Sequence, residues 1–109
     1  MEEKEIIVKV DNKDNNYYYK GKCTVNKDII KFVDEETTYI FDKTIERLIK
    51  TTKEDKTIID FNNKELTVTV DKKELKMPIE INNKQICGNN ILYKYKIDKN
   101  EIKFEIKEV

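Results

Sequence analysis

The regular alternation of hydrophobic and charged residues is the feature that most constrains this chain. Near the end of the sequence Ile102, Phe104 and Ile106 are separated by charged residues, and a similar pattern runs from Ile91 to Ile97. Successive side chains of a strand point to opposite faces, so each such segment has one apolar and one charged face. Turns rich in Asn, Asp and Lys interrupt the pattern about every 8–12 residues, which is typical of a small antiparallel β-protein.

The length and charge of the chain indicate one soluble-type domain with a charged outer surface. Its 109 residues predict a single domain, residues 1–109. Charged residues make up 40% of the chain, with 22 basic and 22 acidic side chains. Because Lys and Glu alternate within the same segments, no strongly basic face is expected, and we predict no nucleic-acid partner.

The alternation predicts ten short strands. The segment 44–51 is ambiguous, because Ile45, Leu48 and Ile49 have helical spacing while its threonines favour a strand, which we prefer. The segment 82–90 lacks alternation and is expected to be a mobile loop. No internal repeat is evident. The expected strands cover about 5–10, 17–25, 29–33, 37–41, 44–51, 56–61, 66–70 and 75–81, followed by two long strands joined at 98–100.

Two residues carry information about strand geometry. Gly21 lies within an expected strand, where glycine often marks a bulge or a sharp bend. Pro78 has no N–H to donate, so its segment is expected to be an edge strand, a bulge or a gap in pairing, with Leu75, Met77, Ile79 and Ile81 facing inward. Exposed sheet edges pair with other molecules, so we predict an all-β fold in which an antiparallel meander closes into an up-and-down barrel of about eight to ten strands. A two-sheet sandwich is the alternative.

The middle and the end of the chain resemble the YwiB-like family of bacterial proteins of unknown function. The likeness covers Tyr18 to Val109 and rests on the run Thr37–Phe41, on Leu48-Ile49-Lys50 at the place of a Leu-Ile-Arg triplet, and on the strand-like segments 66–75 and 102–108. The chain departs from the family at Lys50, which replaces the arginine, and at 62–65, where a Thr-Pro-Tyr-Gly turn is missing. The resemblance implies a calycin-like, that is lipocalin-like, barrel.

The composition argues against common catalytic and metal chemistry. The chain contains no Ser and no His, so neither Ser–His nor Cys–His pairs exist, and two cysteines without His are too few for a zinc site. The glycines form no phosphate-binding loop. The acidic cluster Asp34-Glu35-Glu36 lacks calcium-loop spacing and is interpreted as a turn. We therefore expect no enzyme, no catalytic residue, no metal site and no cofactor.

Further expectations concern location and redox state. The first residues are polar and acidic, and no segment approaches the roughly 20 apolar residues of a membrane helix, so we predict a cytoplasmic protein without membrane insertion. Cys23 and Cys87 form no C-x-x-C pair, and in a reducing compartment they are expected to be buried free thiols.

Aromatic residues provide the one candidate site. Most of the aromatic residues share the expected inward face of their strands, which suits either a small-ligand cavity or a solid aromatic core. They include Tyr17 and Phe104. Arg47 is the only arginine. If its side of the strand faces inward, Arg47 is a buried anchor for a ligand; if the side of Leu48 faces inward, Arg47 is a surface charge. We consider two functions: a non-enzymatic barrel that binds a small apolar or amphipathic ligand, and an interaction domain using outward residues such as Ile7, Tyr18, Ile40, Ile58 and Leu92. The predicted ligand site comprises Tyr19, Tyr39, Phe41, Arg47, Tyr93 and Tyr95.

Overall fold

The computed structural model describes residues 1–109 as eleven strands without a helix. The strands are β1 (Glu2–Asn12), β2 (Asn16–Asn26), β3 (Ile29–Asp34), β4 (Thr37–Asp42), β5 (Arg47–Thr51), β6 (Asp55–Asp60), β7 (Glu65–Val70), β8 (Lys73–Pro78), β9 (Glu80–Cys87), β10 (Asn90–Ile97) and β11 (Asn100–Glu108).

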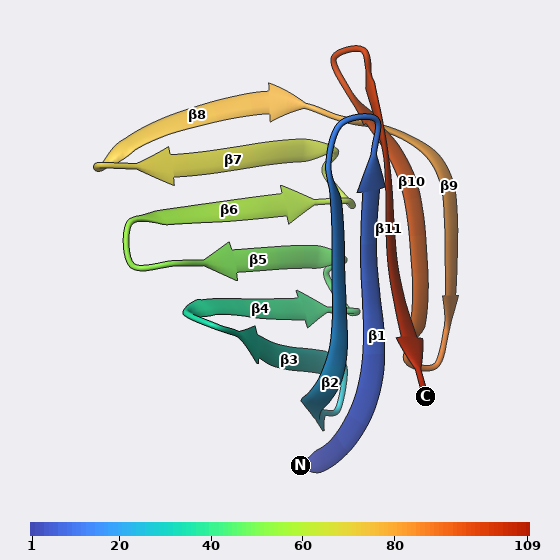
Figure 1. The fold of residues 1–109 in the computed structure, drawn as a ribbon. Coiled ribbons are helices and arrows are strands. Elements are labelled where there is room, and N and C mark those ends of the chain that lie inside the picture. Colours follow the sequence, from blue (N-terminus) through green and yellow to red (C-terminus); the bar gives the residue numbers. More distant parts are fainter.

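All strands form one antiparallel sheet in the order β8-β7-β6-β5-β4-β3-β2-β1-β11-β10-β9. The first strand pairs with the last, so the sheet curls into a ring that lacks a ladder only between β8 and β9. Strands β3–β8 form one layer, and they run crosswise to the layer of β2, β1, β11, β10 and β9 (Figure 1). This confirms the predicted all-β meander and barrel, with eleven strands instead of eight to ten.

The additional strand arises around Ile79. The segment expected to be one strand, 75–81, divides there into β8 and β9, and β9 continues through residues that were expected to be a mobile loop. That expectation was wrong because β9 lies at an edge and needs no alternating pattern on a buried face. A register shift opposite Lys94 and Tyr95 further bends β9 around the corner of the barrel. Pro78 does end an edge strand, as predicted.

Two further residues bear on the expected strand geometry. Of the bulge or sharp bend expected at Gly21, the continuous β1–β2 register excludes the bulge. Gly21 instead makes room for a ring, because a Cβ atom there would lie 2.7 Å from Tyr19 Oη. Leu75 shares the parity of Met77 but is 59% exposed, because the far end of the β7–β8 hairpin projects beyond the opposite layer (Figure 1).

Three consecutive hairpins, β3–β4, β5–β6 and β7–β8, repeat one structural unit. In each, the residue after the hairpin donates its N–H to the carbonyl oxygen of the residue before it. Successive donors and successive acceptors are eighteen residues apart, a repeat that the sequence analysis missed because backbone pairing, not residue identity, is conserved between the units. The three bonds are Lys43 to Asp28 (2.8 Å), Phe61 to Glu46 (2.9 Å) and Ile79 to Lys64 (3.0 Å).

The core is densest at the end of the barrel where the β4–β5 and β6–β7 turns meet β10. The Phe61 ring, from the β6–β7 turn, stacks on Tyr93 with 3.8 Å between ring centroids. The Phe41 ring lies against both of these rings, and the Phe104 ring lies against those of Phe41 and Phe61. Stacked aromatic rings stabilise a fold by about 0.5–1.5 kcal/mol beyond the burial of their area. This aromatic cluster fills the interior of the barrel around Phe61 and Tyr93.

Hydrogen bonds and ion pairs fasten the same end. The Tyr93 hydroxyl donates to Glu46 Oε1 at 2.7 Å, and Lys84 Nζ donates to the same oxygen at 3.0 Å. Lys43 Nζ reaches Gly88 O and Asn89 Oδ1 at 3.2 and 3.1 Å. The turns of one layer are thereby joined to β9, β10 and the β9–β10 turn of the other layer.

Replacing Glu46 with Gln is expected to lower the free energy of unfolding by about 1 kcal/mol at neutral pH, because hydrogen bonds to the carboxylate are stronger than those to an amide. The hydrogen bond from Tyr93 holds the pKa of Glu46 below its ordinary value of 4.5. A depressed carboxyl pKa gives stability that is present above the unfolded-state pKa and is lost as the pH falls through the folded-state pKa. Urea unfolding at several pH values checks this. The difference between native and Glu46→Gln protein should shrink below pH 4.5, whereas Glu101→Gln, an exposed control, should show no such pH-dependent difference.

The β7–β8 turn offers a second test of the fold. Asp71 and Lys72 form its two-residue loop, and both have positive φ values, 51° and 63°. Such turns favour glycine because residues with a Cβ atom are strained in the left-handed region. We expect Lys72→Gly to stabilise the protein by about 0.5–1 kcal/mol, measured as a higher Tm. Lys73→Gly, one residue later in a strand, should lower Tm; a fall in Tm for Lys72→Gly would contradict the turn geometry.

Candidate functional site

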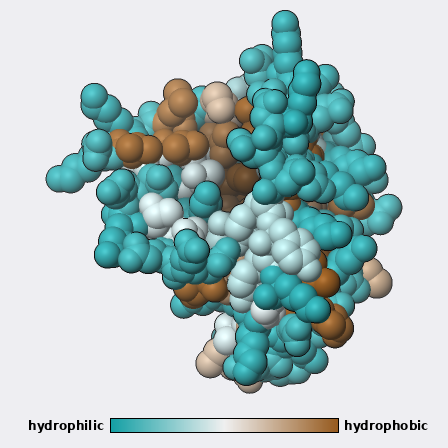
Figure 2. All heavy atoms as spheres, viewed as in Figure 1, coloured by the Kyte–Doolittle hydropathy of each residue, from teal (hydrophilic) through white to brown (hydrophobic).

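A cavity of about 270 Å³ remains between the two layers, next to the Phe61–Tyr93 stack, and is bordered there by Tyr95 and Phe104, whose ring centroids lie 5.3 and 6.2 Å from that of Phe61. In the space-filling view, a hollow with hydrophobic atoms at its bottom lies next to β2, over β6 and β7 (Figure 2). Seven of its nine lining residues are hydrophobic. These residues are Val10, Tyr17, Tyr39, Leu48, Lys50, Thr57, Ile59, Tyr95 and Phe104.

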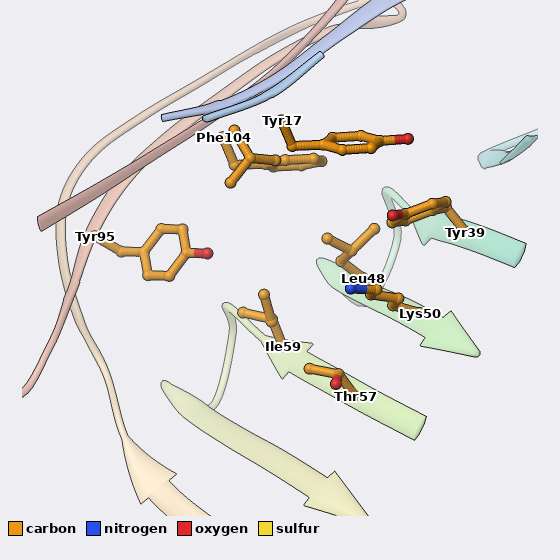
Figure 3. Close-up of a pocket in the computed structure, with 9 residues that line it drawn as sticks. Tyr17, Tyr39, Leu48, Lys50, Thr57, Ile59, Tyr95 and Phe104 are labelled. Carbon is orange, nitrogen blue, oxygen red and sulfur yellow. The ribbon is translucent and has the colours of Figure 1, made fainter. Parts of the chain in front are cut away.

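Both layers contribute side chains to the cavity wall. Tyr17 and Phe104 cover one side from β2 and β11, and Leu48 and Ile59 cover the other from β5 and β6 (Figure 3). The Tyr95 hydroxyl points into the space between them (Figure 3). These residues meet because the cavity lies where strands of opposite layers cross, and the inward parity of each strand places its apolar side chains there.

Two polar side chains, Lys50 and Thr57, and the hydroxyl group of Tyr95 interrupt this apolar wall. Lys50 lies between Tyr39 and Thr57 in the β4–β5 and β5–β6 ladders. The Tyr95 hydroxyl makes no hydrogen bond to another residue, and burial raises the pKa of Tyr95 to about 12. This phenol is therefore a neutral donor near neutral pH. An apolar cavity with a few fixed polar groups is the usual form of a small-molecule site.

An aromatic stack borders the cavity where β2 leaves β3. The ladder between these strands covers only Thr24–Asn26 and Ile29–Lys31. Beyond it, neighbouring rings lie 4.6–5.6 Å apart between centroids in the order Tyr19, Phe32, Tyr39 and Tyr17. The Tyr17 hydroxyl donates to Asp34 Oδ2 at 2.7 Å. Burial and this hydrogen bond raise the pKa of Tyr17, and the bond fixes its ring at the cavity wall.

The predicted site residues separate into two groups. Tyr39 and Tyr95 line the cavity. Phe41 and Tyr93 are buried in the aromatic cluster around Phe61, and Tyr19 stacks on Phe32 with its hydroxyl bound to Lys22 O at 2.7 Å. The structure therefore brings only Tyr39 and Tyr95 of the predicted aromatic residues to the cavity.

Arg47 does not reach the cavity. Its Nη2 atom lies 3.1 Å from Asp60 Oδ2, while Leu48 takes the inward position beside it. Burial alone would raise the pKa of Asp60, but hydrogen bonds from Asn63 and Arg47 outweigh this effect and lower it. Arg47 thus stabilises the β5–β6 hairpin near its end, and its guanidinium already has a carboxylate partner.

Sequence reasoning missed the cation that does line the cavity, Lys50. Strand parity contained the necessary signal, because an inward Leu48 places Lys50 on the inward side two residues later. Lysine was set aside as a solvated residue among many similar ones. Val10, Leu48, Thr57 and Ile59 were also missed, since an aliphatic core residue and a cavity-lining residue look alike in sequence.

Other residue groups show no site geometry. No cluster of three or more His, Cys, Asp or Glu side chains is arranged to hold a metal. Asp34-Glu35-Glu36 end β3 and form its turn, as expected. Both cysteines are free, and Cys23 is buried, but Cys87 is exposed because it lies at the end of edge strand β9, which corrects the expectation for that residue.

The outward hydrophobic residues considered above as an interaction surface differ in exposure, and the interaction function stays a prediction. Only Tyr18 among them is exposed, at 58%, and Ile7, Ile40, Ile58 and Leu92 are half-buried. No helix long and hydrophobic enough to cross a bilayer is present in the structure. The cytoplasmic location expected from the sequence stays a prediction.

Comparison with known proteins identified no relative of this chain. No protein-family model, no curated protein and no solved structure matches the chain. The resemblance to the YwiB-like family, and the calycin-like character it implies, therefore stay predictions, and the functional argument rests on the cavity itself.

Proposed function

We propose that this protein is a non-enzymatic binding protein that takes up a small amphipathic molecule in the cavity of its barrel. The observation that carries the proposal is the cavity of about 270 Å³, whose wall is hydrophobic except for a few polar groups. Apolar surface buried there would contribute about 25 cal/mol per Å² to binding, while the polar groups would orient the ligand.

The contrast between two neighbouring regions of the barrel supports this proposal. In one region Phe41, Phe61 and Tyr93 lie in contact and fill the interior. Beside it Leu48 and Ile59 face Phe104 across the cavity (Figure 3). Protein interiors are normally packed with few voids larger than a water molecule. A solid core therefore describes the region around Phe61, and a binding function accounts for the cavity beside it.

The size of the cavity limits the ligand. Small-molecule sites usually occupy about 300–1,000 Å³, so this cavity is at the small end of the range. A molecule of one or two rings, or a short branched chain, suits it better than a long lipid. The Tyr17 and Tyr39 rings, 5.6 Å apart between centroids, border the site and favour a ligand with a flat or branched apolar body.

Filling the cavity should abolish binding without unfolding the protein. Thr57 lines the cavity, and the equivalent positions of the neighbouring hairpins hold Tyr39 and Leu75, so the strand accepts a large side chain there. We expect Thr57→Phe to weaken binding of 2-naphthol, a small amphipathic probe, by about tenfold or more, measured by chemical-shift titration. Native protein should show saturable shifts at Tyr39 and Tyr95.

The matched control is Thr69→Phe, the same substitution on the outward face of the adjacent strand β7, which should leave the affinity unchanged. Native mass spectrometry of protein purified from its own host would reveal a retained ligand directly. Equal binding by native and Thr57→Phe protein, or no binding of the probe together with no retained ligand, would show that the cavity is not a binding site.

A further inference from the structure

Lys50 is the only charged residue in the cavity wall. The nine ion pairs of the molecule all involve other residues. Its ladder neighbours on either side, Tyr39 and Thr57, are uncharged. The Lys50 side chain extends along the wall near Leu48 (Figure 3). Lys50 is exposed to solvent, and its ammonium group, at the cavity wall, has no carboxylate partner from the protein.

The hairpin repeat shows that the fold does not require a lysine at this position. Two cross-strand pairs occupy the equivalent inward places in the flanking hairpins, Phe32 with Tyr39 and Val68 with Leu75. The middle hairpin has Lys50 with Thr57 instead. A buried apolar side chain stabilises a fold by about 1.5–3 kcal/mol. Phe32 of the first unit is buried and has this gain, whereas Leu75 of the third unit is exposed; only the middle unit, which lies at the cavity, has a cation and a hydroxyl at these two positions.

The opposite side of the cavity adds a neutral donor. The Tyr95 hydroxyl points into the space from β10 and has no hydrogen-bond partner in the protein (Figure 3). The Tyr17 hydroxyl, in contrast, is already bound to Asp34. A ligand that accepts hydrogen bonds and carries negative charge would satisfy both free groups, while a cationic ligand would meet Lys50 without any carboxylate in the wall.

We propose that the cavity selects a small organic carboxylate with a compact apolar body, and that Lys50 binds its carboxylate. This inference rests on the proposed function and specifies its ligand class. A carboxylate fits better than a phosphate, because phosphate sites usually combine several cationic donors or a nest of backbone N–H groups. The cavity wall supplies a single cation, and its other polar groups are hydroxyls.

Three ligands with the same body and different head groups test this inference: 3-phenylpropanoate, 3-phenylpropanamide and 3-phenylpropylammonium. Their affinities would be measured by chemical-shift titration at low salt and neutral pH. We expect the carboxylate to bind about three- to tenfold more tightly than the amide, since the ion pair is partly exposed. The ammonium compound should bind most weakly. Added salt should reduce the difference between carboxylate and amide.

Variants of Lys50 assign the effect to this residue. Lys50→Met should lower the affinity for the carboxylate to about that for the amide and so remove the preference. Lys50→Arg should keep the preference. Lys56→Met, which removes the same charge from the outward face of β6, should leave it unchanged.

The outcomes separate this inference from the function on which it rests. Equal binding of carboxylate and amide by native protein would overturn the selection of an anion and leave the binding function intact. Persistence of the preference in Lys50→Met would overturn the role of Lys50. Failure of all three ligands and of 2-naphthol to bind, together with no retained ligand in native mass spectrometry, would overturn both proposals.

Discussion

The stack of Phe61 on Tyr93 is the contact on which the arrangement of the two layers depends. Phe61 comes from a turn of the β3–β8 layer, and Tyr93 comes from the middle of β10, so their rings join strands that share no ladder. Glu46 reinforces the contact by accepting a hydrogen bond from the Tyr93 hydroxyl. This contact holds the two layers together. Beside it the strands of the two layers cross and diverge, and their side chains leave the cavity unfilled.

The repeated hairpin explains how the fold produces a site without a special loop. In each unit one backbone hydrogen bond joins the residues that precede and follow the hairpin. Side chains eighteen residues apart therefore occupy equivalent places in successive hairpins. Ile30, Leu48 and Leu66 are such a set, and all three are buried. At the next inward position the units differ, as Phe32, Lys50 and Val68. The chemical character of the cavity thus comes from a residue that differs between three hairpins with the same backbone arrangement.

Much of the fold could be predicted from the sequence, because alternation reports directly which residues face inward. The strands near Ile6, Tyr93 and Phe104 follow their parity, and these residues are buried as that parity requires. Prediction from alternation failed for strands at a sheet edge and for side chains that no opposite layer covers. Edge strand β9 shows no alternation, and Leu75 has an inward parity without an opposite layer to cover it.

The candidate site could be predicted only in part. Tyr39 and Tyr95 line the cavity, as strand parity alone suggested, but Phe41 and Tyr93 have the same parity and are buried in the aromatic cluster. Parity gives the face of a strand and carries no information about position along the barrel. Arg47 drew attention because it is the only arginine, yet composition cannot show that Asp60 pairs with it.

The sequence by itself determined the secondary structure, the single antiparallel meander and the apolar interior, because these depend on local alternation and on turn residues. The tertiary structure decided which inward residues meet. The crossing of the layers, fixed by Phe61 and Tyr93, fills the region around these rings and leaves about 270 Å³ beside it. It also turns Lys50 from one of many surface lysines into the only charge of that cavity, since the surroundings of a side chain depend on strands distant in sequence.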